Sequence, residues 1–225
     1  MKRSALLIVF MAALTMSGCL VSSLHPFYKM KDKIFDKTLI GTWIEEGDSS
    51  FWVIEENEIS TGFMNPSRPD STYKIKYYQE DGISILKGTL FVLDGKNYVD
   101  FFPDPEEEHC TPEMTAYHHI PVHTLARLKI TPDSLMFFWY GEEWLNELFE
   151  NNRVRIAHET IEVSSDYTTN VLTASTSDLQ KFIRKYMNDP SVTELIDKAF
   201  NNDIDDVDEH AFLKLYPYDG PIPTK

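Results

Sequence analysis

Apolar and polar residues alternate along much of the chain from residue 38 onward, as they do in β-strands. Tyr73, Ile75 and Tyr77 alternate with lysines, so we expect one face of this segment to be buried and the other to meet solvent. The remaining segments of this kind are rich in β-branched and aromatic residues. The predicted strands are residues 39–45, 51–55, 72–78, 82–93, 96–102, 120–131 and 134–140, with one or two more within 153–172.

Turn and helix signals punctuate these strands. Asp94-Gly95 predicts a tight hairpin between two of them. Ser177 with Gln180 forms a capping-box pattern, which is typical of a helix start. Apolar residues at helical spacing predict helices over residues 142–151, 177–188 and 191–200.

About eight short strands joined mostly by tight turns favour a closed barrel, because closure leaves no unpaired sheet edge. The expected fold class is therefore mainly β (α+β): an eight-stranded antiparallel barrel with C-terminal helices. The opening strand carries Gly41-Thr42-Trp43, which resembles the Gly-x-Trp motif on the first strand of lipocalins and other calycins. Over residues 38–190 the resemblance implies a lipocalin-like barrel, with Trp43 packed across its closed end and a helix after its last strands.

The first 18 residues have the layout of a secretory signal. Lys2 and Arg3 give a basic start, ten apolar residues follow at 5–14, and small residues precede Cys19. The apolar run is too short to span a bilayer, which takes about 20 residues of helix.

Met16-Ser17-Gly18-Cys19 resembles a bacterial lipobox. That resemblance implies a lipoprotein whose signal peptide is cleaved before Cys19 and whose Cys19 thiol carries lipid, with palmitate among the acyl chains. Leu20, and not an aspartate, follows the cysteine, which resembles outer-membrane sorting and implies a domain facing the periplasm. The expected organisation is a signal peptide at 1–18, a lipid anchor and tether that ends by docking at 19–37, and a single barrel domain with C-terminal helices at 38–225.

The N-terminus and the charge together limit the partners. The segment after the cysteine resembles envelope lipoproteins of unknown function, in which a Ser-Leu-x-Pro-x-Tyr motif follows the lipidated residue; here it reads Ser23-Leu24-His25-Pro26-Phe27-Tyr28. The formal charge of −15, from 36 acidic against 21 basic residues, argues against a nucleic-acid partner. We expect contact with the membrane through the N-terminal lipid, and binding of a small apolar ligand or of an envelope protein.

Five potential metal ligands lie close together in the sequence: His109, Cys110, His118, His119 and His123. Imidazole and thiolate ligands together suit zinc or copper. On a regular strand, however, His119 and His123 would lie about 13 Å apart, so they could share an ion only if the chain bends. A zinc- or copper-binding envelope protein is therefore the alternative function, against the simpler interpretation that these are ordinary loop and strand residues.

Motifs of known catalytic sites do not occur in the chain. It has no Gly-x-Ser-x-Gly elbow and no phosphate-binding loop, and His158-Glu159 is not followed by the second histidine of a zinc peptidase. We therefore expect no enzyme and no cofactor beyond the alternative metal. An enzyme whose residues meet only in space stays open, because catalytic groups are assembled by the fold.

Aromatic residues are the candidates for ligand binding. Phe137 and Trp139 belong to a very aromatic segment that must present both faces of a strand, and Tyr117 ends a long proline-rich loop at 103–117. Trp43 is included, although a structural role fits it better. An eight-stranded barrel can be filled by side chains or hold one small ligand, so core packing of these aromatics is the alternative.

Overall fold

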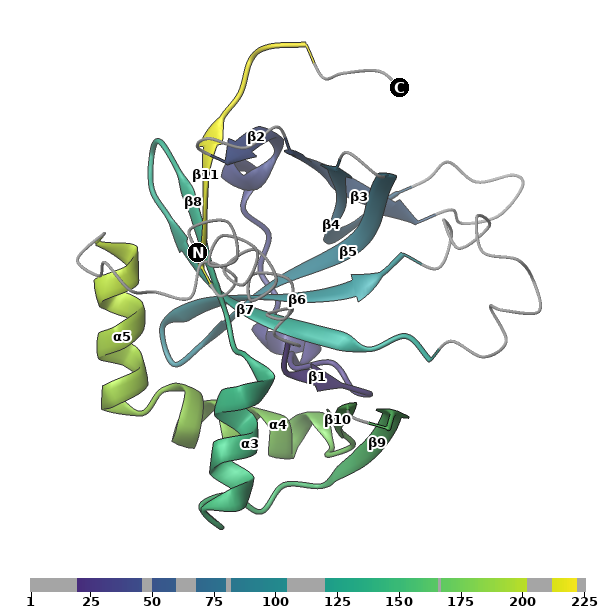
Figure 1. Ribbon diagram of the computed structural model, residues 1–225. Helices are drawn as coiled ribbons and strands as arrows, with labels where there is room; N and C mark the ends of the chain where they lie inside the picture. The colour runs from purple at the N-terminus through teal and green to yellow at the C-terminus, as the bar shows by residue number, and fades with distance from the viewer. Residues whose placement is uncertain are drawn as a thin grey trace, which may run out of the picture.

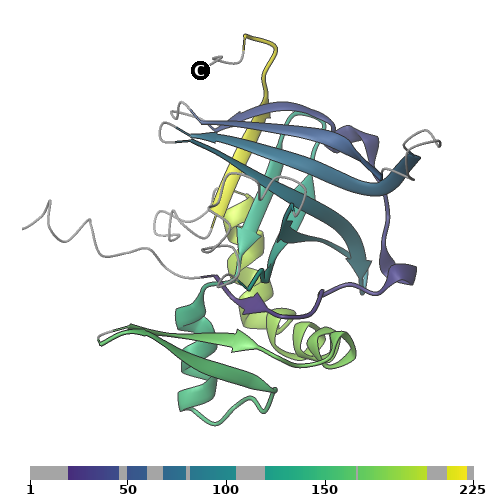
Figure 2. The same ribbon diagram turned by 90° about the vertical axis from the view of Figure 1, so that its right-hand side faces the viewer.

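Eight strands among the described residues form a closed antiparallel barrel in the computed structural model of the chain (Figures 1 and 2). Neighbours pair in the order β2-β3-β4-β5-β6-β7-β8-β11, and β11 closes the barrel against β2. The structure describes residues 20–45, 50–59, 68–79, 82–104, 120–165, 167–201 and 212–221. The barrel strands are β2 (Gly41–Glu45), β3 (Phe51–Ile59), β4 (Arg68–Gln79), β5 (Gly82–Leu93), β6 (Lys96–Pro103), β7 (His123–Ile130), β8 (Leu135–Trp139) and β11 (Phe212–Pro217). The predicted fold class is confirmed, and this barrel is consistent with a lipocalin-like architecture.

The alternation seen in the sequence sets which side chains enter the barrel. Tyr73 and Ile75 on β4 are buried inside it. Lys76, the next residue of the same strand, points outward, and its Nζ lies 2.8 Å from Oε2 of Glu55 on β3. The predicted hairpin joins β5 to β6, where Asp94 and Gly95 have φ values of 52° and 76°. Positive φ at both central residues is what a type I′ turn requires, so this prediction is also confirmed.

The eighth barrel strand is β11, which follows the helices, and not the segment 153–172. That segment forms a hairpin outside the barrel, made of β9 (His158–Ser164) and β10 (Tyr167–Leu172). A short strand, β1 (Ser22–Ser23), pairs antiparallel with β7 and parallel with β10, and so joins the hairpin to the barrel wall.

The segment that leads into β2 packs against the interior of the barrel, where Leu39 is buried beside Trp43. It contains a short 3₁₀ turn, η2 (Lys37–Leu39), and the indole Nε1 of Trp43 donates to the carbonyl oxygen of Leu39 at 3.0 Å. The hydroxyl of Tyr73 pairs with the backbone of Asp36, at 2.7 Å from its N–H and 3.0 Å from its carbonyl oxygen. Trp43 is thus buried and tied to this segment, and its place across a closed end, which the Gly-x-Trp resemblance implies, stays a prediction.

Residues 20–37, predicted as a tether that ends by docking, lie against the folded domain along their length (Figure 2). Val21 and Phe27 are fully buried beside the barrel wall, and a 3₁₀ turn, η1 (Met30–Asp32), follows them. The chain is therefore fixed to the domain from its first described residue, Leu20, which pairs with Gly141.

Helices cover the outside of one barrel wall (Figure 1). They are α3 (Glu142–Glu150), α4 (Thr176–Phe182), which continues into a π-helical turn η4 (Ile183–Met187), and α5 (Pro190–Phe200). The predicted cap of the second helix is wrong by two residues: the hydroxyl of Ser175 accepts from the N–H of Asp178, and Ser177 already lies inside the helix. No helix among the described residues is long and apolar enough to cross a membrane.

Two apolar cores result, one on each side of the barrel wall. We call them the lumen cluster and the outer cluster. The lumen cluster lies inside the barrel, and its largest members include Trp43, Trp52, Ile54, Tyr73, Phe101 and Phe137. The outer cluster lies between the wall and the helices, and its largest members include Phe27, Phe91, Tyr98, Phe138, Tyr140 and Phe182.

Candidate functional site

The aromatic residues of β8 divide between the two cores. Phe137 points into the lumen and is 1 % exposed; its ring lies 6.2 Å from Trp52, 5.9 Å from Phe101 and 5.5 Å from Trp139, centroid to centroid. Phe138, its neighbour in sequence, points outward and packs in the outer cluster. Phe137 and Phe138 thus pack as core, whereas Trp139 is partly buried, and ligand binding by Phe137 and Trp139 stays a prediction.

The two other aromatic candidates have different outcomes. Trp43 is buried and hydrogen-bonded to the carbonyl oxygen of Leu39, which suits a structural role. Tyr117 lies outside the described residues, and its role as a rim residue stays a prediction.

Of the predicted metal ligands, only His123 lies within the described residues. Its Nδ1 is 2.7 Å from Oδ1 of Asp100, and its ring stacks on Phe102 at 4.3 Å. Across the described ranges, no group of three or more His, Cys, Asp or Glu side chains could hold a metal ion. The other four predicted ligands lie outside these ranges, and the zinc or copper hypothesis stays a prediction for them: His109, Cys110, His118 and His119.

Asp100 fastens the N-terminal segment to the barrel wall. Its carboxylate is 1 % exposed; Oδ1 faces His123, and Oδ2 accepts from the backbone N–H of Phe27 at 2.9 Å. Burial raises the pKa of Asp100, while the hydrogen bond and the charge of His123 act against that rise. The position of this pair beneath residues 20–37 suits a structural tie.

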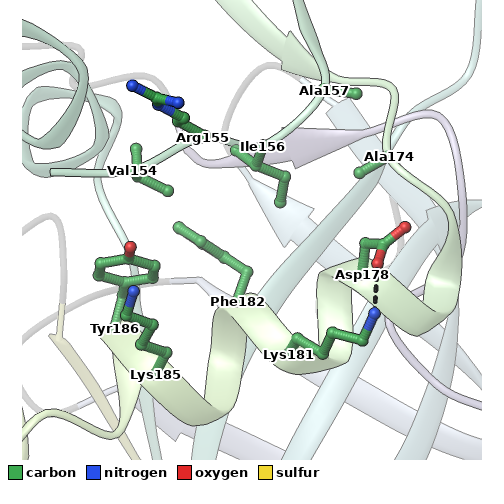
Figure 3. Close-up of a pocket in the computed structure, with 10 residues that line it drawn as sticks. All are labelled: Val154, Arg155, Ile156, Ala157, Ala174, Asp178, Lys181, Phe182, Lys185 and Tyr186. Atoms are coloured by element: carbon green, nitrogen blue, oxygen red, sulfur yellow. Dashed lines mark hydrogen bonds and ion pairs between the residues drawn. The ribbon is translucent and has the colours of Figure 1, made fainter. Parts of the chain in front are cut away.

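A pocket of about 320 Å³ opens in the outer layer, between residues 154–157 and the helical run of α4 and η4 (Figure 3). We call it the outer groove. Its apolar floor includes Phe182, which is 3 % exposed, together with Val154 and Ile156. At one end, the hydroxyl of Tyr186 donates to the carbonyl oxygen of Arg153 at 2.6 Å, which ties the two walls together.

A π-helical turn forms part of the helical wall of this groove. The backbone N–H of Asn188 donates to the carbonyl of Ile183, five residues back, at 3.0 Å. Leu179 and Ile183 are fully buried in the outer cluster, whereas Lys181 and Lys185 lie on the groove side. Turns of this kind are frequent at functional sites.

Positive charge predominates around the groove. Arg155, Lys181 and Lys185 line it, against one carboxylate, Asp178. Lys181 Nζ lies 2.8 Å from Asp178 Oδ1 and holds the pKa of that carboxyl below its usual range, and Lys185 Nζ lies 4.9 Å from the ring centre of Tyr186. The groove therefore offers an apolar surface bordered by cations, which suits a molecule with an apolar body and an anionic end.

The sequence contained part of this site without revealing it. The pattern placed Phe182 and Tyr186 on the apolar face of a helix, and lysines at a spacing of four follow the same helix. The opposite wall was predicted as strand, and only the structure shows that residues 154–157 face α4 across a gap.

A scan against protein-family models, a search of curated proteins and a search of solved structures each found no match to this chain.

Proposed function

We propose that this chain is a lipid-anchored envelope protein that binds a small anionic amphiphile without catalysing a reaction. The observation that carries the proposal is the outer groove, with its apolar floor and its surplus of positive charge. Small-molecule sites are typically concave and mostly apolar, with a few polar groups that fix the orientation of the ligand.

The size of the groove limits the ligand. Sites for small molecules range from about 300 to 1,000 Å³, and at about 320 Å³ the groove is at the lower end. Each buried methylene contributes about 0.8 kcal/mol. The apolar part of a short acyl chain or ring therefore supplies most of the affinity, and the cations select a carboxylate or similar anionic end.

The anchor is proposed from the N-terminal sequence. Lys2 and Arg3, the apolar run at 5–14 and the lipobox-like ending at Cys19 support lipidation, outer-membrane sorting and a periplasmic domain. With lipid on Cys19, the domain would sit directly at the membrane, because Leu20 is already paired with Gly141.

Metabolic labelling tests the anchor. The full chain, expressed in a bacterial host that processes lipoproteins, should incorporate labelled palmitate and fractionate with membranes. Cys19→Ala should abolish both. Unlabelled wild-type protein, or labelling that persists in Cys19→Ala, would reject lipidation at this residue.

Dodecanoate and dodecanol test the groove, because they differ only in the anionic end. Arg155→Glu with Lys185→Glu should weaken dodecanoate binding roughly tenfold or more, by the loss of two favourable charge contacts, and leave dodecanol binding unchanged. Ala157 lies at the exposed edge of the groove, so Ala157→Trp should block both ligands. Isothermal titration calorimetry of the detergent-solubilised full chain measures each affinity.

Lys31→Glu is the matched control, because Lys31 is exposed and lies outside the groove. It reverses a charge without touching the proposed site and should leave both affinities unchanged. Dodecanoate binding that survives Ala157→Trp, or that falls equally in Lys31→Glu, would place the ligand elsewhere and overturn the proposal.

A further inference from the structure

A second pocket, of about 460 Å³, lies where β6 and β7 meet α5. It is separate from the outer groove and shares no lining residue with it. Its charged side chains are Lys96 on β6, Arg127 and Lys129 on β7, and Asp197 on α5. Three cations and one carboxylate leave a local surplus of positive charge in a chain whose formal charge is −15.

Arg127 is a largely buried cation of this pocket, and its guanidinium is only partly paired. Its side chain is 11 % exposed, and its Nη2 lies 3.5 Å from Oδ1 of Asp197, whose own side chain is 57 % exposed. Its Nη1 is buried and has no hydrogen-bond partner among the described residues. A guanidinium removed from water without full pairing is costly, and a bound anion would offset that cost.

The hydrogen bonds of the two lysines are to neutral groups, so they leave the positive charge of the pocket in place. Lys96 Nζ donates to Oδ1 of Asn188 at 2.9 Å and to Oγ1 of Thr193 at 3.2 Å, and both acceptors are neutral. Burial lowers the pKa of Lys96, and the charge of Arg127 lowers it further, while Asp197 and Asp94 act in the opposite direction.

Lys129 is held in the same way from the other side of the pocket. Its Nζ lies 3.4 Å from the carbonyl oxygen of Phe200, 3.2 Å from Oδ1 of Asn201, and 5.7 Å from the ring centre of Phe200. None of these partners carries a negative charge. Asp197 is therefore the single carboxylate in the described lining that faces three cations.

We propose that this pocket binds the oxyanion group of a small polar molecule, a phosphate or a carboxylate, between Arg127 and Lys129. Arginine recognises such groups through parallel N–H donors, and lysine adds a point charge. Asp197 shares Arg127 with the incoming anion and opposes it by like charge. This site goes beyond the amphiphile bound in the outer groove, because its walls are largely polar and its cations are different.

Isothermal titration calorimetry of the detergent-solubilised full chain with inorganic phosphate, and separately with acetate, tests the site. Arg127→Gln and Lys129→Gln should each weaken binding about tenfold or more, which is the effect of losing one charge-assisted hydrogen bond. Asp197→Asn should instead tighten binding several-fold, because it removes the opposing charge. Lys31→Gln, an exposed lysine outside the pocket, should change nothing. If Arg127→Gln does not fold, the opposite effects of Lys129→Gln and Asp197→Asn still decide the matter.

The other outcomes separate the sources of the anion. Vesicles containing phosphatidylglycerol, captured by the wild type and less by Lys129→Gln, would support the site with a lipid headgroup as its phosphate. Equal weakening in Lys31→Gln would show general charge attraction and overturn the proposal, as would the absence of saturable binding by any probe. Residues 202–210 follow α5 and are strongly acidic. Phosphate binding that appears only after Asp203, Asp205 and Asp206 are changed to Asn would mean that this acidic stretch, and not a separate anion, occupies the pocket. That result would also overturn the proposal.

Discussion

The lumen cluster and the outer cluster are both dense apolar cores, yet they are held together differently. Rings stacked on rings fill the lumen, as Phe137 with Trp52 and Trp139 shows. In the outer cluster, buried polar side chains tie distant segments to the barrel. Asp100 on β6 accepts from the backbone of Phe27, about one third of the chain away.

Two further ties follow the same pattern. Gln180 on α4 donates to Oδ2 of Asp32 at 2.8 Å, and the carboxylate of Glu142 on α3 accepts from the backbone N–H of Asn170 at 2.6 Å. Different apolar segments can cover the same apolar surface, whereas a buried hydrogen bond forms only when its own partner is in place. The contrast indicates that the lumen supplies the rigid scaffold and the outer layer determines which surfaces are built on it. The outer groove and the pocket between β6, β7 and α5 both lie in that outer layer.

Phe137 and Phe138 offer the strongest test of this contrast, because they are adjacent on β8 and point into different cores. Phe137→Ala should cost about 3–5 kcal/mol of unfolding free energy, since the enclosed lumen cannot collapse around the cavity. Phe138→Ala should cost about 3 kcal/mol, at the lower end of that range, because helices can shift toward the space. Urea unfolding followed by tryptophan fluorescence measures both free energies.

Hydrogen exchange then shows where each cost falls. Phe138→Ala should speed exchange in α3, α4 and α5 more than in the barrel strands, whereas Phe137→Ala should speed exchange throughout. Leu195→Ala, on the exposed side of α5, is the control and should have little effect on either measurement. The same exchange pattern in both phenylalanine variants would show that the two cores open as one unit.

The barrel was largely predictable from the sequence because its signals are local. Alternation of Tyr73, Ile75 and Tyr77 with lysines, and the Asp94-Gly95 turn, specify strands and a hairpin without reference to distant residues. The strand β11 was not predicted. It has only six residues, and its pairing with β2 and β8 depends on three helices that intervene in the sequence.

The candidate site was less predictable, for the same reason. Lys181 and Lys185 reveal a basic helix face, but no local pattern says that residues 154–157 will face it. In the sequence, Arg127 fits an ordinary outward-facing strand residue, and only the structure shows that its Nη1 is buried and that its Nη2 lies 3.5 Å from Asp197 on α5. Pockets between segments distant in sequence are products of packing, and binary pattern does not encode them.

Asp100 gives a smaller effect with a characteristic pH dependence. Asp100→Asn disturbs the buried hydrogen bonds at His123 and Phe27 and should cost about 1–3 kcal/mol at pH 4. Burial raises the pKa of Asp100 in the folded state, so the carboxyl group of Asp100 stays protonated to a higher pH in the folded protein than in the unfolded chain. The contribution of Asp100 to stability is therefore present near pH 4 and is lost as the pH rises through the folded pKa, so the difference between wild type and variant should shrink.

Urea unfolding at steps between pH 4 and pH 8 follows that difference. Asp219→Asn, at an exposed position, should show no such trend. A difference that widens with rising pH would mean that the pair with His123 outweighs burial, and that the outer layer is held by an ion pair.

Asp70, at the start of β4, should show the smallest effect and the opposite sign. Burial acts to raise the pKa of Asp70, but hydrogen bonds from Lys87, whose Nζ is 2.8 Å away, and from Thr72 outweigh it and hold the pKa below its usual range. The stability that Asp70 contributes is thus present above the pKa of the unfolded chain, about 3.9, and is lost as the pH falls through the folded value. Asp70→Asn should cost about 1 kcal/mol at pH 7 and almost nothing in strong acid. Lys87→Gln should reproduce the loss at pH 7, since it removes the other half of the pair. If Asp70 and Asp100 instead respond to pH in the same direction, pairing with Lys87 and burial do not set opposite pH dependences for these two carboxylates.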